Sequence, residues 1–92
     1  MIQSFKDKET KKIWQLKLSK KIPGAIQQRA LNKLNLIDQA SKVEDLRIPP
    51  SNHLKALAGK RKNQFSIRIN DQYRICFEWN NGAEEVEICD YH

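Results

Sequence analysis

The side chains best suited to chemistry lie at the end of the chain and in the strand-like segment before it. The chain ends with Asp90, Tyr91 and His92. Histidine and tyrosine can both transfer protons, and the ordinary histidine pKa of about 6.5 suits transfer in either direction near neutrality. Arg68 and Arg74 lie upstream, and guanidinium groups bind phosphate oxygens bidentately. These residue types suit acid–base chemistry beside a phosphate group.

A second group of candidates lies between residues 51 and 63. Pro49 and Pro50 precede this segment, and because proline cannot continue a helix, we expect a loop here. Gly59 permits a sharp turn within it. The loop holds one histidine and four cations: His53, Lys55, Lys60, Arg61 and Lys62. The histidine fits a catalytic role or that of an ordinary surface residue.

Positive charge is concentrated in the first two thirds of the chain. Residues 1–62 hold 15 Lys and Arg against 5 Asp and Glu, and residues 63–92 hold 2 against 6, which together give the net charge of +6. A basic region of this size indicates a polyanionic partner, most often nucleic acid. A solvated helical surface, with Arg29 and Lys33 on its wet side, explains the same charge equally well.

The chain length of 92 residues suits one domain with a single modest core. The N-terminal residues contain no long apolar run, so the sequence predicts no secretory or membrane segment and a cytoplasmic location. Cys76 and Cys89 are predicted to be reduced structural thiols. They have no CxxC spacing or clustered histidines that would make a zinc site, and we expect no metal or cofactor.

The first half of the chain has helical periodicity. We expect a short strand over residues 2–5, a helix over 7–17, a second helix over 23–40 and a short third helix from residue 41. The apolar residues of the second helix recur every three or four positions and are predicted to pack in the core: Ile26, Ala30, Leu34 and Ile37.

From residue 64 onward, apolar and polar residues alternate as in a strand. We expect three antiparallel strands, joined by loops at residues 70–72 and 80–83. Packing these strands on two helices would bury both apolar stripes, which predicts an α+β fold.

Matching apolar residues across the strands sets the register of the predicted sheet. The predicted pairs are Ile67–Ile75, Phe77–Val86, Arg68–Arg74 and Arg74–Cys89. The two arginines then lie side by side on the outward face, where like charges are destabilising. Either Glu87, diagonal to Arg74, or a bound phosphate would offset this repulsion.

Two motifs carry a resemblance to a known family. The segment from Ser66 to Phe77 reads S-I-R-I-N-D-Q-Y-R-I-C-F, and the chain ends in D-Y-H. At this spacing they resemble the HigB branch of the RelE/ParE toxin superfamily. The stretch from Pro49 to Gly59 and the N-terminal helices also fit, so the resemblance covers residues 1–92 as one domain.

This resemblance implies a curved sheet flanked by helices and an endoribonuclease that needs no metal or other cofactor. Members of the family typically depend on the ribosome and cut messenger RNA in the decoding site. Each is neutralised by a HigA-type antitoxin, usually a helix-turn-helix protein that also represses the shared operon. We therefore expect operator DNA to be bound only through the complex with the antitoxin.

Cleavage of RNA without a metal uses the ribose 2′-hydroxyl as nucleophile and needs a base, an acid and cations around the phosphate. We expect His92 and Tyr91 to do the acid–base work or to orient the nucleotide. Asp90 has the parity of the apolar face and would orient its neighbours. The remaining cations would hold phosphate: Arg74, Arg68, Arg61, Lys55, Lys60 and Lys62.

The loop departs from the family pattern. Some HigB toxins carry a catalytic histidine in an L-H-x-L-x-G context, and Lys55 occupies that position here. His53 lies two residues earlier, so either residue is a candidate.

Two other functions compete with RNA cleavage. A ParE-like protein would inhibit DNA gyrase by binding it, without nuclease residues. A noncatalytic RNA- or protein-binding module would need only the basic charge. The D-Y-H ending and the bases of the loop favour the nuclease.

Overall fold

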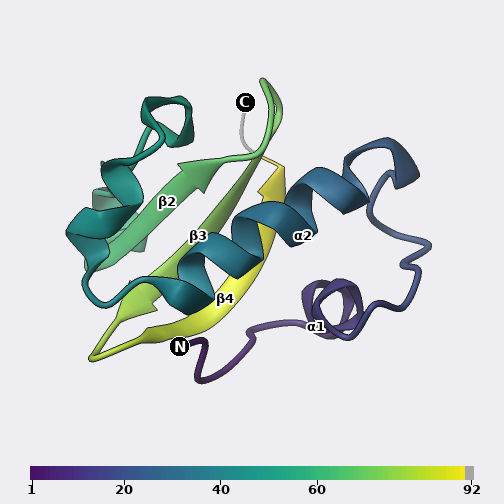
Figure 1. Ribbon diagram of the computed structural model, residues 1–92, viewed down its shortest axis with the longest axis horizontal. Helices are drawn as coiled ribbons and strands as arrows, with labels where there is room; N and C mark the ends of the chain where they lie inside the picture. Colours follow the sequence, from purple (N-terminus) through teal and green to yellow (C-terminus); the bar gives the residue numbers. More distant parts are fainter. Residues whose placement is uncertain (91–92) are drawn as a thin grey trace.

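The computed structural model describes residues 1–90 and places two helices against a four-stranded antiparallel sheet with the order β1-β2-β3-β4 (Figure 1). Helix α2 crosses one face of the sheet, and α1 packs beside it against β4. The predicted α+β fold is confirmed. None of the helices in the described part of the chain is long and apolar enough to cross a membrane.

The two helices form where the sequence predicts them, but both are shorter. Helix α1 (Lys8–Trp14) follows Asp7, whose carboxylate caps it by accepting a hydrogen bond from the amide of Thr10 at 2.9 Å. It ends before residue 17 because Leu16 adopts a left-handed backbone with a φ of 64°. Helix α2 (Gly24–Gln39) buries the four predicted apolar residues.

The segments around these helices differ from expectation. The predicted strand at residues 2–5 is reduced to two isolated bridges, from Ile2 to Ala83 and from Phe5 to Val86. The predicted third helix is a short 3-10 helix, η1 (Val43–Arg47). The carboxylate of Asp45 accepts hydrogen bonds from the backbone amides before it and thereby fixes its start.

Strands β2 (Gln64–Arg68), β3 (Tyr73–Trp79) and β4 (Ala83–Asp90) form the predicted part of the sheet. Three of the four predicted pairs are confirmed: Ile67–Ile75, Arg68–Arg74 and Arg74–Cys89. The fourth, Phe77–Val86, falls in a register shift between Cys76 and Glu78.

The register shift arises because the loop between β3 and β4 is one residue shorter than predicted. Trp79 pairs directly with Ala83, and a bulge at Glu85, whose φ is 52°, absorbs the extra residue. Gly82 closes the loop with a φ of 151°. A Cβ atom at Gly82 would lie 2.6 Å from the carbonyl oxygen of Met1, so the N-terminal segment can approach only a glycine.

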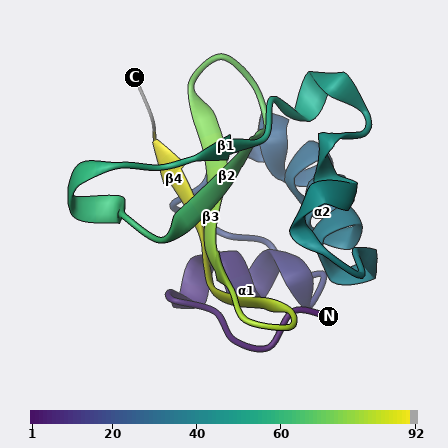
Figure 2. The same ribbon diagram turned by 90° about the vertical axis from the view of Figure 1, so that its left-hand side faces the viewer.

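The fourth strand, β1 (Lys55–Ala56), was not predicted. It pairs with β2 at the edge of the sheet, inside the segment expected to be only a loop. This segment also contains the 3-10 helices η2 (Pro50–Asn52) and η3 (Gly59–Arg61). Figure 2 shows the η3 turn projecting on the side of the sheet opposite α2.

The hydrophobic core lies between the helices and the sheet. Its largest fully buried apolar side chains come from α2, η1 and all three long strands: Leu34, Ile37, Leu46, Ile67, Ile75, Phe77 and Val86. The core side chains of each long strand occupy alternate positions and point to one face of the sheet. The residues between them form the opposite face. This second face carries the paired arginines Arg68 and Arg74.

Candidate functional site

The sheet face away from α2 carries two rows of polar side chains. Paired residues share a face, so the register places one row across all four strands and a second row across three. The first row is Lys55, Ser66, Cys76 and Glu87, and the second is Arg68, Arg74 and Cys89. We call this surface the polar face.

The polar face is more covered than its sequence suggests. Its residues were expected to point into solvent, but Ser66 and Cys76 are fully buried and Cys89 is nearly so. Alternation assigns side chains to a face of a strand and does not say what covers that face. Here the segment from η2 to η3 lies beside it and contacts it through His53 and Arg61.

Arg74 is the central cation of the polar face, and its predicted exposure is wrong. Its side chain is buried, with a relative exposure of 7 %. The guanidinium donates to Ser66 Oγ at 2.8 Å, to the Ser66 carbonyl at 3.3 Å and to the His53 carbonyl at 2.5 Å. Arg74 therefore ties β3 to β2 and to the η2–β1 connection, which fixes the orientation of its guanidinium.

Two candidates, His53 and Lys55, lie where the η2–β1 connection meets Arg74 and Ser66. His53 has a left-handed backbone with a φ of 45°, which turns its carbonyl toward Arg74, while the residue itself is exposed. Lys55 is exposed at the edge of the first polar row. The structure thus brings the backbone of His53 to Arg74 and places Lys55 beside Ser66.

Arg61 reaches the polar face from η3. It donates to Gln64 at 3.1 Å and to the carboxylate of Glu87 at 3.3 Å, and Lys6 binds the same carboxylate at 3.2 Å. The negative charge of Glu87, one of the two groups that could offset the two arginines, is thus engaged by Arg61 and Lys6. The other two cations of this segment, Lys60 and Lys62, are exposed.

Cys76 and Cys89 are buried free thiols on β3 and β4. A hydrogen bond between them lowers the pKa of Cys76 and raises the pKa of Cys89. Both thiols are buried and form no disulfide with each other, which agrees with the structural role predicted from the sequence.

Asp90 closes β4 at the end of the described chain. It pairs with Tyr73, is exposed, and accepts a hydrogen bond from the side-chain amide of Gln72 at 3.1 Å. Tyr91 and His92, the predicted acid–base residues, lie outside the described residues. Because Arg74 is paired with Cys89, the D-Y-H segment begins one residue after the position opposite Arg74.

Arg68 does not join Arg74 in holding one group, although their backbones are paired. Its guanidinium forms an ion pair with Asp71, an exposed carboxylate in the loop between β2 and β3. Arg68 also lines a pocket between α2 and the end of β2 with a volume of 430 Å³. The phosphate expected between the two arginines stays a prediction.

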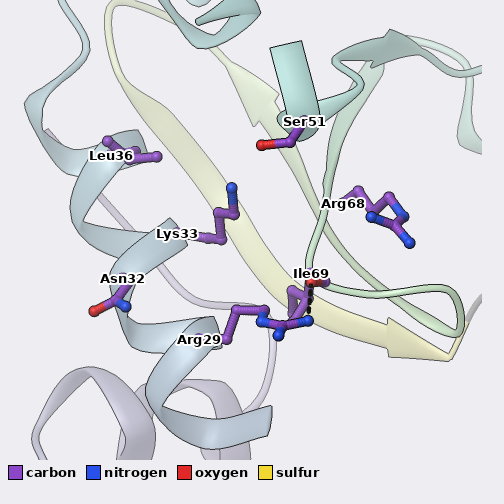
Figure 3. A pocket seen from close by; sticks show the side chains of 7 residues that line it. All are labelled: Arg29, Asn32, Lys33, Leu36, Ser51, Arg68 and Ile69. Atoms are coloured by element: carbon purple, nitrogen blue, oxygen red, sulfur yellow. Dashed lines mark hydrogen bonds between the residues drawn. The ribbon is translucent and has the colours of Figure 1, made fainter. Parts of the chain in front are cut away.

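This pocket, which we call the cation pocket, was not predicted. It is lined by Arg29, Asn32, Lys33, Leu36, Ser51, Arg68 and Ile69 (Figure 3). Arg29 and Lys33 were both expected on a solvated surface, and Arg29 is exposed as predicted while Lys33 is half-buried. Their spacing of four residues was the available signal, because it stacks two like charges on one helix face at a cost in stability.

Comparison with known proteins identifies the family. Residues 3–92 match the model described as the RelE-like toxin of type II toxin–antitoxin system HigB. The chain belongs to this family. It is 38 % identical to Toxin HigB-1 of Vibrio cholerae over 93 aligned positions, which cover 100 % of this chain and 98 % of the relative. It is 31 % identical to the Endoribonuclease HigB of Proteus vulgaris, with both chains covered completely.

Membership of this HigB family confirms the resemblance carried by the S-I-R-I-N-D-Q-Y-R-I and D-Y-H motifs. The protein is the toxin of a type II toxin–antitoxin system, which implies a cognate antitoxin as its partner. An uncharacterized protein of Haemophilus influenzae is also similar, with 36 % identity over 72 positions covering 78 % of this chain and 71 % of the relative.

Proposed function

We propose that this HigB toxin is a metal-independent endoribonuclease that cleaves messenger RNA on the ribosome. The observation that carries the proposal is the pairing of Arg74 with Cys89. This pairing sets a fixed guanidinium beside the strand end from which Asp90, Tyr91 and His92 follow. The name of the Proteus vulgaris relative, an endoribonuclease, supports the same activity.

In the proposed reaction, the ribose 2′-hydroxyl attacks the adjacent phosphorus while a base accepts its proton. The bond to the 5′-oxygen breaks, and an acid protonates that oxygen. The products are a 2′,3′-cyclic phosphate and a 5′-hydroxyl end. Tyr91 and His92 serve as the base and the acid, and Asp90 orients these two side chains.

Cations on and beside the polar face stabilise the phosphate as its charge grows. Preorganised donors act best because they need no reorganisation during the reaction. Arg74 meets this requirement through its three hydrogen bonds to Ser66 and His53. Lys55 and Arg61 flank it, and further contacts with RNA backbone come from Arg68, Lys60 and Lys62. His53 is a further candidate for proton transfer.

We also propose that the antitoxin is a HigA-type helix-turn-helix protein and that operator DNA is bound only through the toxin–antitoxin complex. This follows from the family alone. The toxin then acts in the cytoplasm, where its messenger RNA substrate and the ribosome are found.

The test is cleavage of messenger RNA on programmed ribosomes, with the new ends mapped. The wild type is compared with a His92 deletion, Tyr91→Phe and a surface control, Lys42→Gln, each with and without EDTA. We expect in-frame cuts by the wild type and the control, unaffected by EDTA, and loss of most cleavage in the deletion with its melting temperature unchanged.

Two results would contradict the proposal. Full cleavage by the His92 deletion removes that residue from the mechanism. Intact messenger RNA together with DNA-damage signalling after toxin induction would favour the ParE-like inhibition of gyrase instead.

A further inference from the structure

The cation pocket lies between α2 and the end of β2, where Arg68 of the polar face also lines it. Figure 3 shows Lys33 pointing from α2 toward Ser51, with the Arg29 guanidinium beside Ile69. The ammonium of Lys33 donates to Asn52 Oδ1 at 2.6 Å, and Arg29 donates to the Ile69 carbonyl at 3.4 Å. Both cations are therefore oriented by neutral oxygens.

The orientation of Lys33 is imposed by a buried residue. Asn52 is fully buried, and its side-chain amide donates to the carbonyls of Leu46 and Ile48 at 3.1 and 3.4 Å. This leaves the amide oxygen facing Lys33. Because two hydrogen bonds fix the Asn52 amide, its oxygen holds the Lys33 ammonium in the pocket, and no carboxylate is needed there.

The charges of the pocket are not balanced. Within residues 1–90, no carboxylate forms an ion pair with Arg29 or Lys33. Burial and then the positive charges of Arg29 and Arg68 lower the pKa of Lys33. An anion placed among the three cations would convert their repulsion into attraction.

We propose that the cation pocket binds a backbone phosphate of RNA, as an anchoring site separate from the cleavage chemistry. Its donors suit a phosphate: a guanidinium, an ammonium and the hydroxyl of Ser51. The Arg68 guanidinium is turned toward exposed Asp71, and such a surface ion pair is weak enough to exchange for a phosphate.

RNA is favoured over an acidic protein segment because the pocket adjoins the polar face. Arg68 lines the pocket and also lies opposite Arg74 in the β2–β3 ladder. An RNA strand held at Arg74 therefore reaches the pocket by passing the end of β2. The inference rests on the proposed function in that it assigns a second contact to the same RNA.

Binding is measured with a short single-stranded RNA methylated at every 2′-oxygen. Such RNA lacks the nucleophile, so binding is separated from cleavage. The variants are Arg29→Gln, Lys33→Gln and their double, and the control is Lys11→Gln/Lys42→Gln, which removes two exposed lysines elsewhere. Melting curves establish that every variant is folded.

We expect the double variant to bind more weakly than the control and with a weaker salt dependence. For single-stranded nucleic acid, each phosphate that a protein neutralises contributes about 0.7 to the slope of log Kobs against log salt. We expect the magnitude of this slope to decrease by about 0.7 more in the double variant than in the control.

The proposal is overturned if the double variant and the control have the same affinity and slope. It is also overturned if the double variant keeps the wild-type RNA affinity and slope but loses binding to the antitoxin, because the pocket then serves protein carboxylates. Failure of the wild type to cut RNA on ribosomes, with normal binding of methylated RNA, would instead count against the proposed function alone.

Discussion

Arg74 and Lys33 carry the same charge on opposite sides of the sheet, but their surroundings differ. Arg74 is buried under the η2–β1 connection and donates three hydrogen bonds to Ser66 and His53. Lys33 is partly buried, is affected by the positive charges of Arg29 and Arg68, and donates to Asn52. Oxygens of two chain segments hold Arg74, whereas one neutral oxygen holds Lys33, which also lies beside two further cations.

The largest effect is expected from Arg74→Ala. The substitution leaves the buried Ser66 hydroxyl and the His53 carbonyl without this donor, which costs about 2–3 kcal/mol in the free energy of unfolding. Urea denaturation measures the loss. Arg68→Ala is the matched control and should cost less than about 1 kcal/mol, so equal losses would refute the bracing role.

A smaller loss is expected from Asn52→Ala. The substitution removes the donors to the Leu46 and Ile48 carbonyls and the acceptor for Lys33. We expect a cost of about 1–3 kcal/mol, since buried polar groups lose their partners. Asn35→Ala, on the exposed surface of α2, is the control. A change no larger than in that control would show that Asn52 does not organise the pocket.

Glu87→Gln tests the second set of contacts on the polar face. Both ion pairs of this carboxylate involve partly exposed cations, with side-chain exposures of 53 % for Lys6 and 34 % for Arg61. We expect a loss of less than about 1 kcal/mol that fades as salt is added. A loss that persists in high salt would mean that Glu87 has a packing role.

The smallest effect, and one of opposite sign, is expected from Lys33→Gln. Glutamine can still donate to Asn52 and removes the repulsion with Arg29 and Arg68, so the melting temperature should rise slightly at low salt. Because burial and these charges lower the folded pKa of Lys33, the unfolded chain binds more protons between that value and the ordinary 10.5. Wild-type stability should therefore gain on the variant as the pH rises through this window.

A melting temperature that falls in Lys33→Gln would show that the pocket is a structural site. In that case the comparison with Arg74 would fail, since both cations would stabilise the fold.

The elements that the sequence predicts are those with a regular pattern. The stripe of Ile26, Ala30, Leu34 and Ile37 identifies α2, and period-two alternation identifies β2, β3 and β4. Apolar matching also gives the correct register at Arg68 and Arg74. These features depend on local sequence, which is why they could be recognised without a structure.

The missed features depend on contacts between distant segments. Strand β1 has only two residues, too few to show the alternation of apolar and polar side chains by which a strand is recognised. The burial of Arg74 depends on the segment that carries His53. The cation pocket depends on α2 lying beside the end of β2, which the solvent-facing position of Arg29 on its helix does not reveal.

The N-terminal segment has a consequence for the order of folding. Ser4 accepts a hydrogen bond through its hydroxyl from the amide of Glu85, 81 residues along the chain, and another through its carbonyl from Val86. Each doubling of a closed loop adds about 0.6 kcal/mol of entropic cost, so the short hairpins close first. We therefore expect the N-terminal segment to dock on the bulge of β4 only after the hairpins of the sheet have formed.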